Sequence, residues 1–279
     1  MIRVAYLGPE QTNTHLAAIK RFGRRARYVH APTVDDVFIE VERQRADYGV
    51  VPVENSLEGA VTHTLDRFID FKHSPVKIHG EVEQLIHHAL ILRAGTALEE
   101  VGTVFSHPQA LAQCRQWLER HLPRAHRWET SSTAAAMEYL NKRQPGLGPS
   151  ARRAVIGRPE LVRAGLRAIP IPDDRENKTR FLILGLGEAP KGRRNKTSIM
   201  FALKDKPGAL HDSLVPFKGS RINLTKIESR PSKRRAWEYL FFIDFEGHAT
   251  EPRVQRALTS LQRHTADFQL LGSYPSIRP

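Results

Sequence analysis

The side chains best suited to chemistry on a small polar molecule lie in residues 173–181. This segment reads Asp-Asp-Arg-Glu-Asn-Lys-Thr-Arg-Phe and runs directly into the apolar stretch 182–185. It places an amide, a hydroxyl and a guanidinium close together, at Asn177, Thr179 and Arg180. All three donate hydrogen bonds, and the guanidinium also neutralises negative charge. They are candidate site residues, although a solvated loop that leads into a core strand has the same pattern.

The strand that follows is expected to position these groups. Residues 179–184 read as a short buried strand. Successive side chains of a strand point to opposite faces, so we expect Thr179 and Arg180 to leave on opposite sides. A strand end is rigid enough to aim the Thr179 hydroxyl.

Three further segments, residues 8–15, 53–61 and 105–114, join a strand to polar residues that suit the start of the next element. In the first, Thr12 and its two neighbours are good helix caps, and the free amides of a helix start bind anions. In the third, Ser106 and Gln109 have the spacing of a capping box, with Gln113 one turn beyond Gln109. Ser132 with Thr133 is a weaker case, read as a cap. Together these junctions predict a cleft lined for a ligand that carries carboxylates.

Composition limits the class of protein. The chain has 279 residues, 40% of them hydrophobic, and can bury a sizeable core. Its one cysteine, Cys114, excludes an internal disulfide and fits a reducing compartment. The histidines show no metal-ligand spacing, and adjacent His87 and His88 in a strand would point to opposite faces, so we predict no metal. The first nine residues are too short an apolar run for a signal peptide, and no stretch approaches a membrane span. We expect a cytoplasmic protein.

The net charge of +13 is uneven, with +4 in residues 1–188 (26 basic, 22 acidic) and +9 in residues 189–279 (17 basic, 8 acidic). The basic runs 191–196 and 233–235 carry no aromatic interleaving and no nucleic-acid motif. We read them as a solvated linker and a solvated turn, and expect no nucleic-acid partner. The excess charge can still steer an anionic metabolite to the protein.

The order of expected elements predicts two domains. Strands at 2–7, 48–53, 85–92 and 102–105 alternate with helices at 14–22, 34–43 and 109–121, which is typical of an α/β domain. After residue 196 the pattern restarts. Strand 197–203, helix 209–217, strands 222–228 and 237–245, helix 252–264 and strand 268–272 make a βαββαβ unit of about eighty residues.

The motifs together resemble prephenate dehydratase over essentially the whole chain. The resemblance is carried by Gly8-Pro9 with Thr12, by Glu54-Asn55-Ser56 with Gly59, by the run 106–111 with Gln113-Cys114, and by the run 177–181. Pro207-Gly208-Ala209-Leu210-His211 and Glu228-Ser229-Arg230-Pro231 resemble the ACT regulatory domain of the same enzymes. The family's frequent fused chorismate mutase segment would precede Gly8, where the chain has no room for it, so we expect a monofunctional enzyme.

The resemblance implies a fold and a division of the chain. The catalytic domain would be residues 1–188, with two α/β lobes similar to periplasmic binding proteins and substrate in the cleft between them. Lobe one would be about 1–75 with 171–188, and lobe two about 76–170. Residues 189–196 would be a linker, and 197–279 a ferredoxin-like ACT domain.

It also implies the residues of two sites. The catalytic positions are Thr179, Ser106, Gln113 and Asn55. Substrate-binding candidates are Thr12, Glu54, Ser56 and Arg180. The phenylalanine site would comprise Gly208, Ala209, Leu210, His211, Asn223, Leu224, Glu228, Ser229, Arg230 and Pro231. The first loop departs from the family pattern, with Gln11 for a glycine, Asn13 for a phenylalanine and Thr14 for a serine.

The implied reaction removes carbon dioxide and hydroxide from prephenate to give phenylpyruvate, with no cofactor. Thr179 would assist the leaving hydroxide, while Asn55, Ser106 and Gln113 would position the ring and carboxylates. Two alternatives stay open: arogenate as the substrate, and a non-catalytic amino-acid-sensing binding protein. Domains that resemble ACT modules pair side by side, so we expect a homodimer or homotetramer with phenylalanine as effector.

Overall fold

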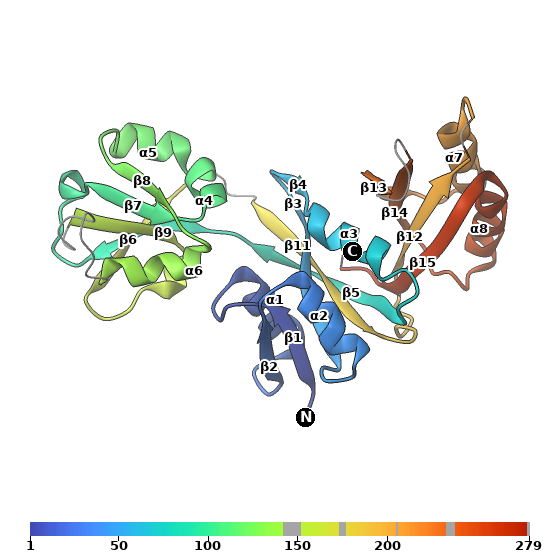
Figure 1. Cartoon of the computed structure of the whole chain (residues 1–279), viewed down its shortest axis with the longest axis horizontal. Helices are drawn as coiled ribbons and strands as arrows, with labels where there is room; N and C mark the ends of the chain where they lie inside the picture. Colours follow the sequence, from blue (N-terminus) through green and yellow to red (C-terminus); the bar gives the residue numbers. More distant parts are fainter. Residues whose placement is uncertain (142–151, 173–176, 205, 233–237, 278–279) are drawn as a thin grey trace. The chain divides into compact units, whose positions relative to one another are not determined.

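The computed structural model describes all residues except 142–151, 173–176, 205, 233–237 and 278–279 (Figure 1). The chain forms two compact units. Unit 1 comprises residues 1–8, 17–84 and 179–279, and unit 2 comprises residues 9–16 and 85–178. Each unit is therefore built from segments that are distant in the sequence.

The first sheet of unit 1 has the order β2-β1-β3-β11-β5, with the short β4 paired to β3. Its strands are β1 (Arg3–Leu7), β2 (Arg27–Ala31), β3 (Tyr48–Asn55), β4 (Gly59–Ala60), β5 (Val76–Leu85) and β11 (Lys178–Leu186). Strand β1 runs parallel to β2 and β3, whereas β11 runs antiparallel to β3. The site residues of β11 therefore lie in the interior of a sheet.

Helices cover both faces of this sheet. They are α1 (Asn13–Phe22), α2 (Val34–Glu42) and α3 (Thr62–Asp70). Helix α2 begins with a complete capping box between Thr33 and Asp36. One core holds Phe38 of α2 and Phe68 of α3, and a separate core holds Ala17 of α1 with Tyr6 of β1. Apolar residues on both faces are what a covered sheet requires.

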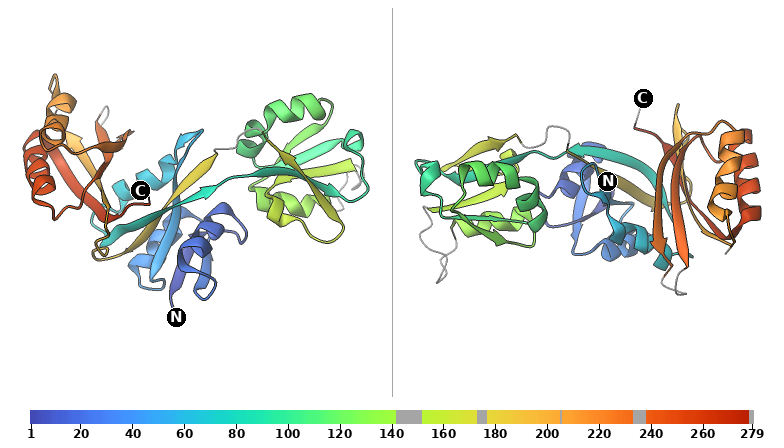
Figure 2. Two further views of the ribbon diagram at one scale, coloured as in Figure 1. Left: turned by 180° about the vertical axis from the view of Figure 1, so that it is seen from behind. Right: turned by 90° about the horizontal axis from the view of Figure 1, so that it is seen from above.

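The rest of unit 1 is the expected βαββαβ domain. It runs β12 (Asn195–Leu203), α7 (Ala209–Gly219), β13 (Leu224–Pro231), β14 (Tyr239–Glu246), α8 (Pro252–His264) and β15 (Thr265–Pro275). The strand order β13-β14-β12-β15 is antiparallel throughout. Helices α7 and α8 cover one face, with a core that includes Phe217 and Phe245 (Figure 2).

The other face of the βαββαβ sheet packs against the first sheet of unit 1. Met200, Phe242 and Leu271 share one core with Phe68 and Ile78. The approach is closest at Gly272, where an added Cβ would lie 2.3 Å from the Ile78 carbonyl oxygen. The domain is thus joined to the first sheet through a common core.

Unit 2 is built on a separate sheet of five strands, in the order β10-β6-β9-β7-β8. The strands are β6 (His88–Arg93), β7 (Thr103–Ser106), β8 (His126–Glu129), β9 (Arg153–Gly157) and β10 (Leu166–Ile171). The helices are α4 (Pro108–Gln113), α5 (Arg115–His121) and α6 (Thr133–Ala136), with 3₁₀ turns at Leu98–Glu100, Met137–Leu140 and Pro159–Leu161. Separate cores around Trp117 and Phe105 cover its two faces.

Several predicted boundaries need correction. Residues 76–84, expected in lobe two, belong to β5 of the first sheet, and residues 171–178, expected in lobe one, fall in unit 2. The predicted strand 85–92 is instead the end of β5 followed by β6, so His87 lies outside both strands. The predicted helix 109–121 is two helices, because Cys114 has a non-helical ψ of 12°. The predicted linker 189–196 is partly strand, with Asn195 and Lys196 buried in β12. Trp237, the predicted start of strand 237–245, lies outside the described residues.

Candidate functional site

The hydroxyl of Thr179 meets the amide of Asn55 in unit 1. The two residues are directly opposite each other on β11 and β3. The Asn55 Nδ2 donates a hydrogen bond to Thr179 Oγ1 at 3.0 Å. Thr179 is half-buried and Asn55 is buried at 6% exposure. Because Oγ1 accepts from Asn55, the Thr179 proton is directed away from this amide.

The orientation of the Asn55 amide is set by the turn that follows β3. Its Oδ1 accepts from the backbone amides of Leu57 at 3.0 Å and Glu58 at 3.2 Å. Because Oδ1 must be the atom that faces these two donors, the other atom of the amide is Nδ2, and Nδ2 therefore faces Thr179. The prediction that residues 53–61 cap the following element is wrong. Helix α3 has no side-chain cap, since the polar residues form the turn between β3 and β4.

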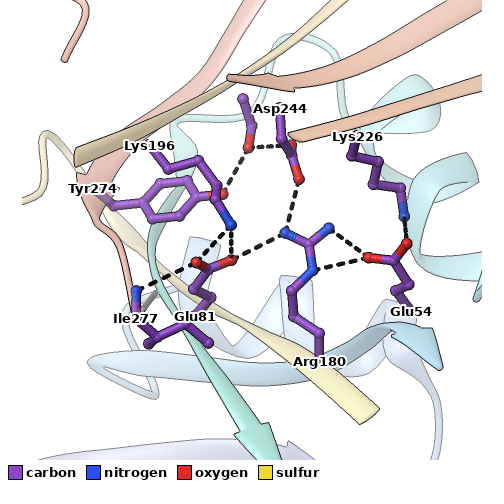
Figure 3. Close-up of polar contacts among 9 residues, drawn as sticks. Glu54, Glu81, Arg180, Lys196, Lys226, Asp244, Tyr274 and Ile277 are labelled. Carbon is purple, nitrogen blue, oxygen red and sulfur yellow. Dashed lines mark hydrogen bonds and ion pairs between the residues drawn. The ribbon is translucent and has the colours of Figure 1, made fainter. Parts of the chain in front are cut away.

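Thr179 and Arg180 leave opposite faces of β11, as the strand pattern predicts. Arg180 is paired with Glu54, its partner across the two strands, at 3.0 Å. It also contacts Glu81 at 3.0 Å and Asp244 at 2.8 Å (Figure 3). Burial disfavours its charge, but Asp244 and the other carboxylates outweigh burial and raise the pKa of Arg180. The predicted substrate-binding residues Arg180 and Glu54 therefore bind each other, whereas Ser56 is exposed in the turn.

Ser106 lies in unit 2 at the end of β7 and is fully buried. Its hydroxyl donates to the carbonyl of Ile156 on β9 at 2.8 Å. The predicted capping box of Ser106 with Gln109 is wrong, because the side chain turns into the sheet. The cap of α4 is His107, whose Nδ1 accepts from the Gln109 amide at 3.3 Å. Ser106 thus joins β7 to β9 beneath the start of α4.

Gln113 sits at the centre of a small polar cluster in unit 2. Its Oε1 accepts from Asn177 Nδ2 at 3.2 Å and lies 2.8 Å from His88 Nε2. Since Oε1 only accepts, His88 is assigned its proton on Nε2. His88 and Asn177 were missed as partners of Gln113. Asn177 stands in the motif at 177–181, but nothing in the local sequence links His88 to position 113.

The first loop, residues 9–16, also belongs to unit 2. Thr12 caps α1, as predicted, by accepting from the His15 amide at 3.3 Å. Gln11 adopts a left-handed φ of 64°, a region that favours glycine. Its carbonyl accepts from Arg158 Nη2. Arg158 is only 5% exposed, and burial lowers its pKa. A buried guanidinium therefore lies beside the start of α1.

The predicted effector residues form two groups in the βαββαβ domain. Gly208, with a φ of 76°, precedes α7, whose first turn holds Ala209, Leu210 and His211. Residues 224–231 form β13, the edge strand, which β14 separates from β12. Asn223 donates to Glu246 at 3.2 Å, and Arg230 is paired with Asp66 of α3 at 3.0 Å. The backbone at Gly208 and the exposed edge of β13 are the parts open to a ligand or a second copy.

Two further observations concern what the described residues can bind. A cavity of about 760 Å³ in unit 2 is lined by Gln11 of the first loop together with Met137, Leu161 and Arg163. Within the described ranges, no three His, Cys, Asp or Glu side chains are grouped so that they could hold a metal ion. None of the helices in those ranges is both long and apolar enough to cross a bilayer.

Comparisons with known proteins cover nearly the whole chain. The family model for prephenate dehydratase matches residues 4–189, and that for the ACT domain matches residues 197–263. A bifunctional chorismate mutase/prephenate dehydratase from Aquifex aeolicus is 48% identical over 275 residues, which are 98% of this chain and 74% of that protein. A prephenate dehydratase from Methanocaldococcus jannaschii is 40% identical over 252 residues, which are 87% of this chain and 86% of that protein.

Solved structures agree with the sequence comparisons. A crystal structure of prephenate dehydratase in complex with L-Phe, from Arthrobacter aurescens, is 33% identical with a TM-score of 0.87. It covers 98% of this chain and 90% of the other. A prephenate dehydratase from Staphylococcus aureus, 24% identical with a TM-score of 0.80, has the same fold. The chain therefore belongs to the prephenate dehydratase family, with an α/β catalytic part followed by an ACT domain.

Proposed function

We propose that this chain converts prephenate to phenylpyruvate, carbon dioxide and water. The proposal is supported by the family and by one observation above all, the hydrogen bond from Asn55 to Thr179. In the reaction the bond between the ring and its carboxylate breaks, and its electron pair moves into the ring. The bond between the opposite ring carbon and its hydroxyl then breaks, and the oxygen leaves as water once it gains a proton. Aromatisation drives the reaction.

Thr179 acts on the leaving oxygen. No base has to remove a ring proton, because carbon dioxide departs in its place. The step that needs help is the departure of the hydroxyl, and a hydroxyl donor aimed at it stabilises the developing charge. Because Asn55 occupies Thr179 as an acceptor, the Thr179 O–H is the part of this pair that points to substrate. A threonine is a weak acid, so it donates a hydrogen bond or relays a proton from solvent.

The remaining residues orient the substrate. Gln113, held by Asn177 and His88, contacts the polar groups of prephenate, and Asn55 fixes Thr179. Ser106 acts by holding β7 to β9 under α4, since its hydroxyl is buried. The start of α1 with its cap Thr12, aided by the buried charge of Arg158, attracts a substrate carboxylate.

Phenylalanine is the effector of the ACT domain in this proposal, and it binds at Gly208–His211 and β13. Gly208–His211 follow β12 and begin α7, and β14 separates β12 from β13, which favours a site completed by a second copy, so the protein is at least a dimer. We place it in the cytoplasm, where its single cysteine stays reduced.

The test is direct turnover. Incubation of the purified chain with prephenate should release phenylpyruvate, detected by its ultraviolet absorbance. Parallel reactions with arogenate, followed as phenylalanine formation, decide between the two substrates. No product from either would leave the amino-acid-sensing alternative.

A further inference from the structure

A cluster of charges, buried except at the partly exposed Glu54, joins the catalytic sheet to the ACT domain within unit 1 (Figure 3). It contains three cations and three anions, so its formal charges cancel. The cations are Arg180, Lys196 and Lys226, and the anions are Glu54, Glu81 and Asp244. We call these six residues the ion cluster. Three neighbouring strands of the first sheet, β3, β11 and β5, contribute Glu54, Arg180 and Glu81.

Each ACT strand also contributes a residue to the cluster or to its hydrogen bonds. Lys196 of β12 donates to both oxygens of Glu81, at 2.7 and 2.8 Å. Asp244 of β14 accepts from Arg180 and from Ser198, which also bonds the Tyr274 hydroxyl of β15 at 2.8 Å. Burial raises the pKa of the Tyr274 hydroxyl. Contacts from the ACT sheet and from the first sheet therefore fix the positions of Glu81 and Asp244.

The cluster lies one residue away from the proposed catalytic pair. Glu54 precedes Asn55 on β3, and Arg180 follows Thr179 on β11. Both pairs are direct partners across the two strands. Alternate side chains leave opposite faces, so the hydrogen-bonded pair and the ion pair are fixed to the same two strand ends from opposite sides. A displacement of Glu54 or Arg180 therefore also moves the strand ends that position Asn55 and Thr179.

Lys226 connects this arrangement to the strand proposed to bind effector. It lies on β13, two residues after Leu224 and two before Glu228. Its side chain is 8% exposed, and its Nζ is 3.7 Å from Glu54 Oε1. Among the described residues this Nζ has no hydrogen-bond partner. Burial lowers the pKa of Lys226. Of the cluster's cations, it has the loosest contact.

We propose that Lys226 is the residue through which effector on β13 alters the geometry of Asn55 and Thr179, by changing its contact with Glu54. This inference rests on the proposed function, since it requires phenylalanine at β13 and catalysis at Thr179.

The physical basis is the cost of moving one charge in a buried, balanced set. Lys226 and Arg180 are buried cations that share the partly exposed Glu54, so a shift of Lys226 leaves a buried charge without its partner and forces Glu54 and Arg180 to readjust. Close packing of the shared core leaves little room for a gradual response. A coupling between two sites typically changes affinity by about 5- to 150-fold.

The experiment compares three variants of the full chain with the parent. Lys226→Met removes the charge and keeps a chain of similar length, whereas Lys226→Arg keeps the charge. Lys72→Met is the matched control, because the Lys72–Asp267 ion pair also joins the ACT domain to the rest of unit 1 but touches neither β3 nor β11. For each protein, phenylalanine affinity is measured by calorimetry, and kcat and KM for prephenate are measured with and without phenylalanine.

We expect Lys226→Met to bind phenylalanine within about 3-fold of the parent, while the effect of phenylalanine on kcat and KM falls below about 3-fold. Lys226→Arg and Lys72→Met should keep the parent's response. A Lys226→Met protein that responds fully, that no longer binds phenylalanine, or that behaves like Lys72→Met would overturn the proposal.

If Lys226→Met does not fold, Glu54→Gln tests the same contact from the other strand. It should lose the response to phenylalanine while phenylalanine still binds, and a retained response would overturn the proposal. Failure of the proposed function is distinguishable, because it shows in the parent itself, as absent turnover of prephenate or absent binding of phenylalanine.

Discussion

Replacing Thr179 by valine removes one hydroxyl and keeps the branched shape that suits a strand. The Thr179 Oγ1 accepts from Asn55 at 3.0 Å, so the substitution removes that bond as well as the donor proposed for the leaving oxygen. A positioned proton donor contributes about 10² to 10⁴ in rate, which corresponds to roughly 3 to 5 kcal/mol of transition-state stabilisation. Orientation by a neutral hydrogen bond is worth only about 1 kcal/mol, or about 5-fold.

These magnitudes separate two roles for Thr179. If it assists the leaving group, kcat should fall by about 10² to 10⁴ and KM should change by less than about 3-fold. If it serves only as a packing and hydrogen-bonding residue, the loss should stay near 5-fold. Thr179→Ala should resemble Thr179→Val, whereas Thr179→Ser keeps the hydroxyl and should retain more activity.

The assay is phenylpyruvate release from prephenate, with thermal melting as the check on folding. The valine variant leaves the Asn55 amide without its acceptor, which costs about 1 to 3 kcal/mol, so activity is compared well below the melting temperature. A folded Thr179→Val protein with near-parent kcat would refute the role assigned to Thr179.

Asn55→Asp should lower kcat by at least about 10-fold, because an acceptor in place of Nδ2 draws the Thr179 proton away from substrate. Steady-state kinetics measure kcat, and a kcat equal to that of the parent would contradict the role of the Asn55–Thr179 hydrogen bond. Burial opposes ionisation of Asp244, but Arg180, Ser198 and Lys196 outweigh burial and lower the pKa of Asp244. The ionised Asp244 therefore stabilises the fold at pH values above 3.8, the ordinary pKa of an aspartate, and this contribution is lost as the pH falls below that value. Melting curves against pH should therefore show a lower Tm for Asp244→Asn at neutral pH and a smaller acid-induced drop, and parallel curves would argue against this ion pair. Gly272→Ala should lower Tm by several degrees, since the new Cβ meets the Ile78 carbonyl at 2.3 Å, and an unchanged Tm would contradict the close approach. Gln11→Gly with Asn13→Phe should change the ratio of activities on prephenate and arogenate, because the loop caps the start of α1; an unchanged ratio would leave the loop a packing role.

Local patterns predicted the elements well and their contacts poorly. The buried strand from residue 179 and the opposite faces of Thr179 and Arg180 follow from the alternation of the sequence, and the structure has both. The partner of Thr179 does not follow, because Asn55 is 124 residues away and meets it only through the pairing of β11 with β3.

The errors have the same origin. Ser106 has the spacing of a cap, but its hydroxyl donates a hydrogen bond to a carbonyl of β9 instead. Lys196 stands in a basic run that reads as a solvated linker, yet it is 4% exposed because Glu81 of β5 compensates its charge. A charged residue in a strand gives no local signal of a buried partner more than one hundred residues away. For the same reason, the local sequence does not indicate that His88 lies beside Gln113.

The most direct test of the proposed function is the rate of phenylpyruvate formation from prephenate by the purified full chain, measured for the parent and Thr179→Val side by side. We expect turnover by the parent, inhibition of that turnover by phenylalanine, and a loss of about 10² to 10⁴ in kcat for the variant. No phenylpyruvate from the parent, or equal rates from parent and folded variant, would contradict it.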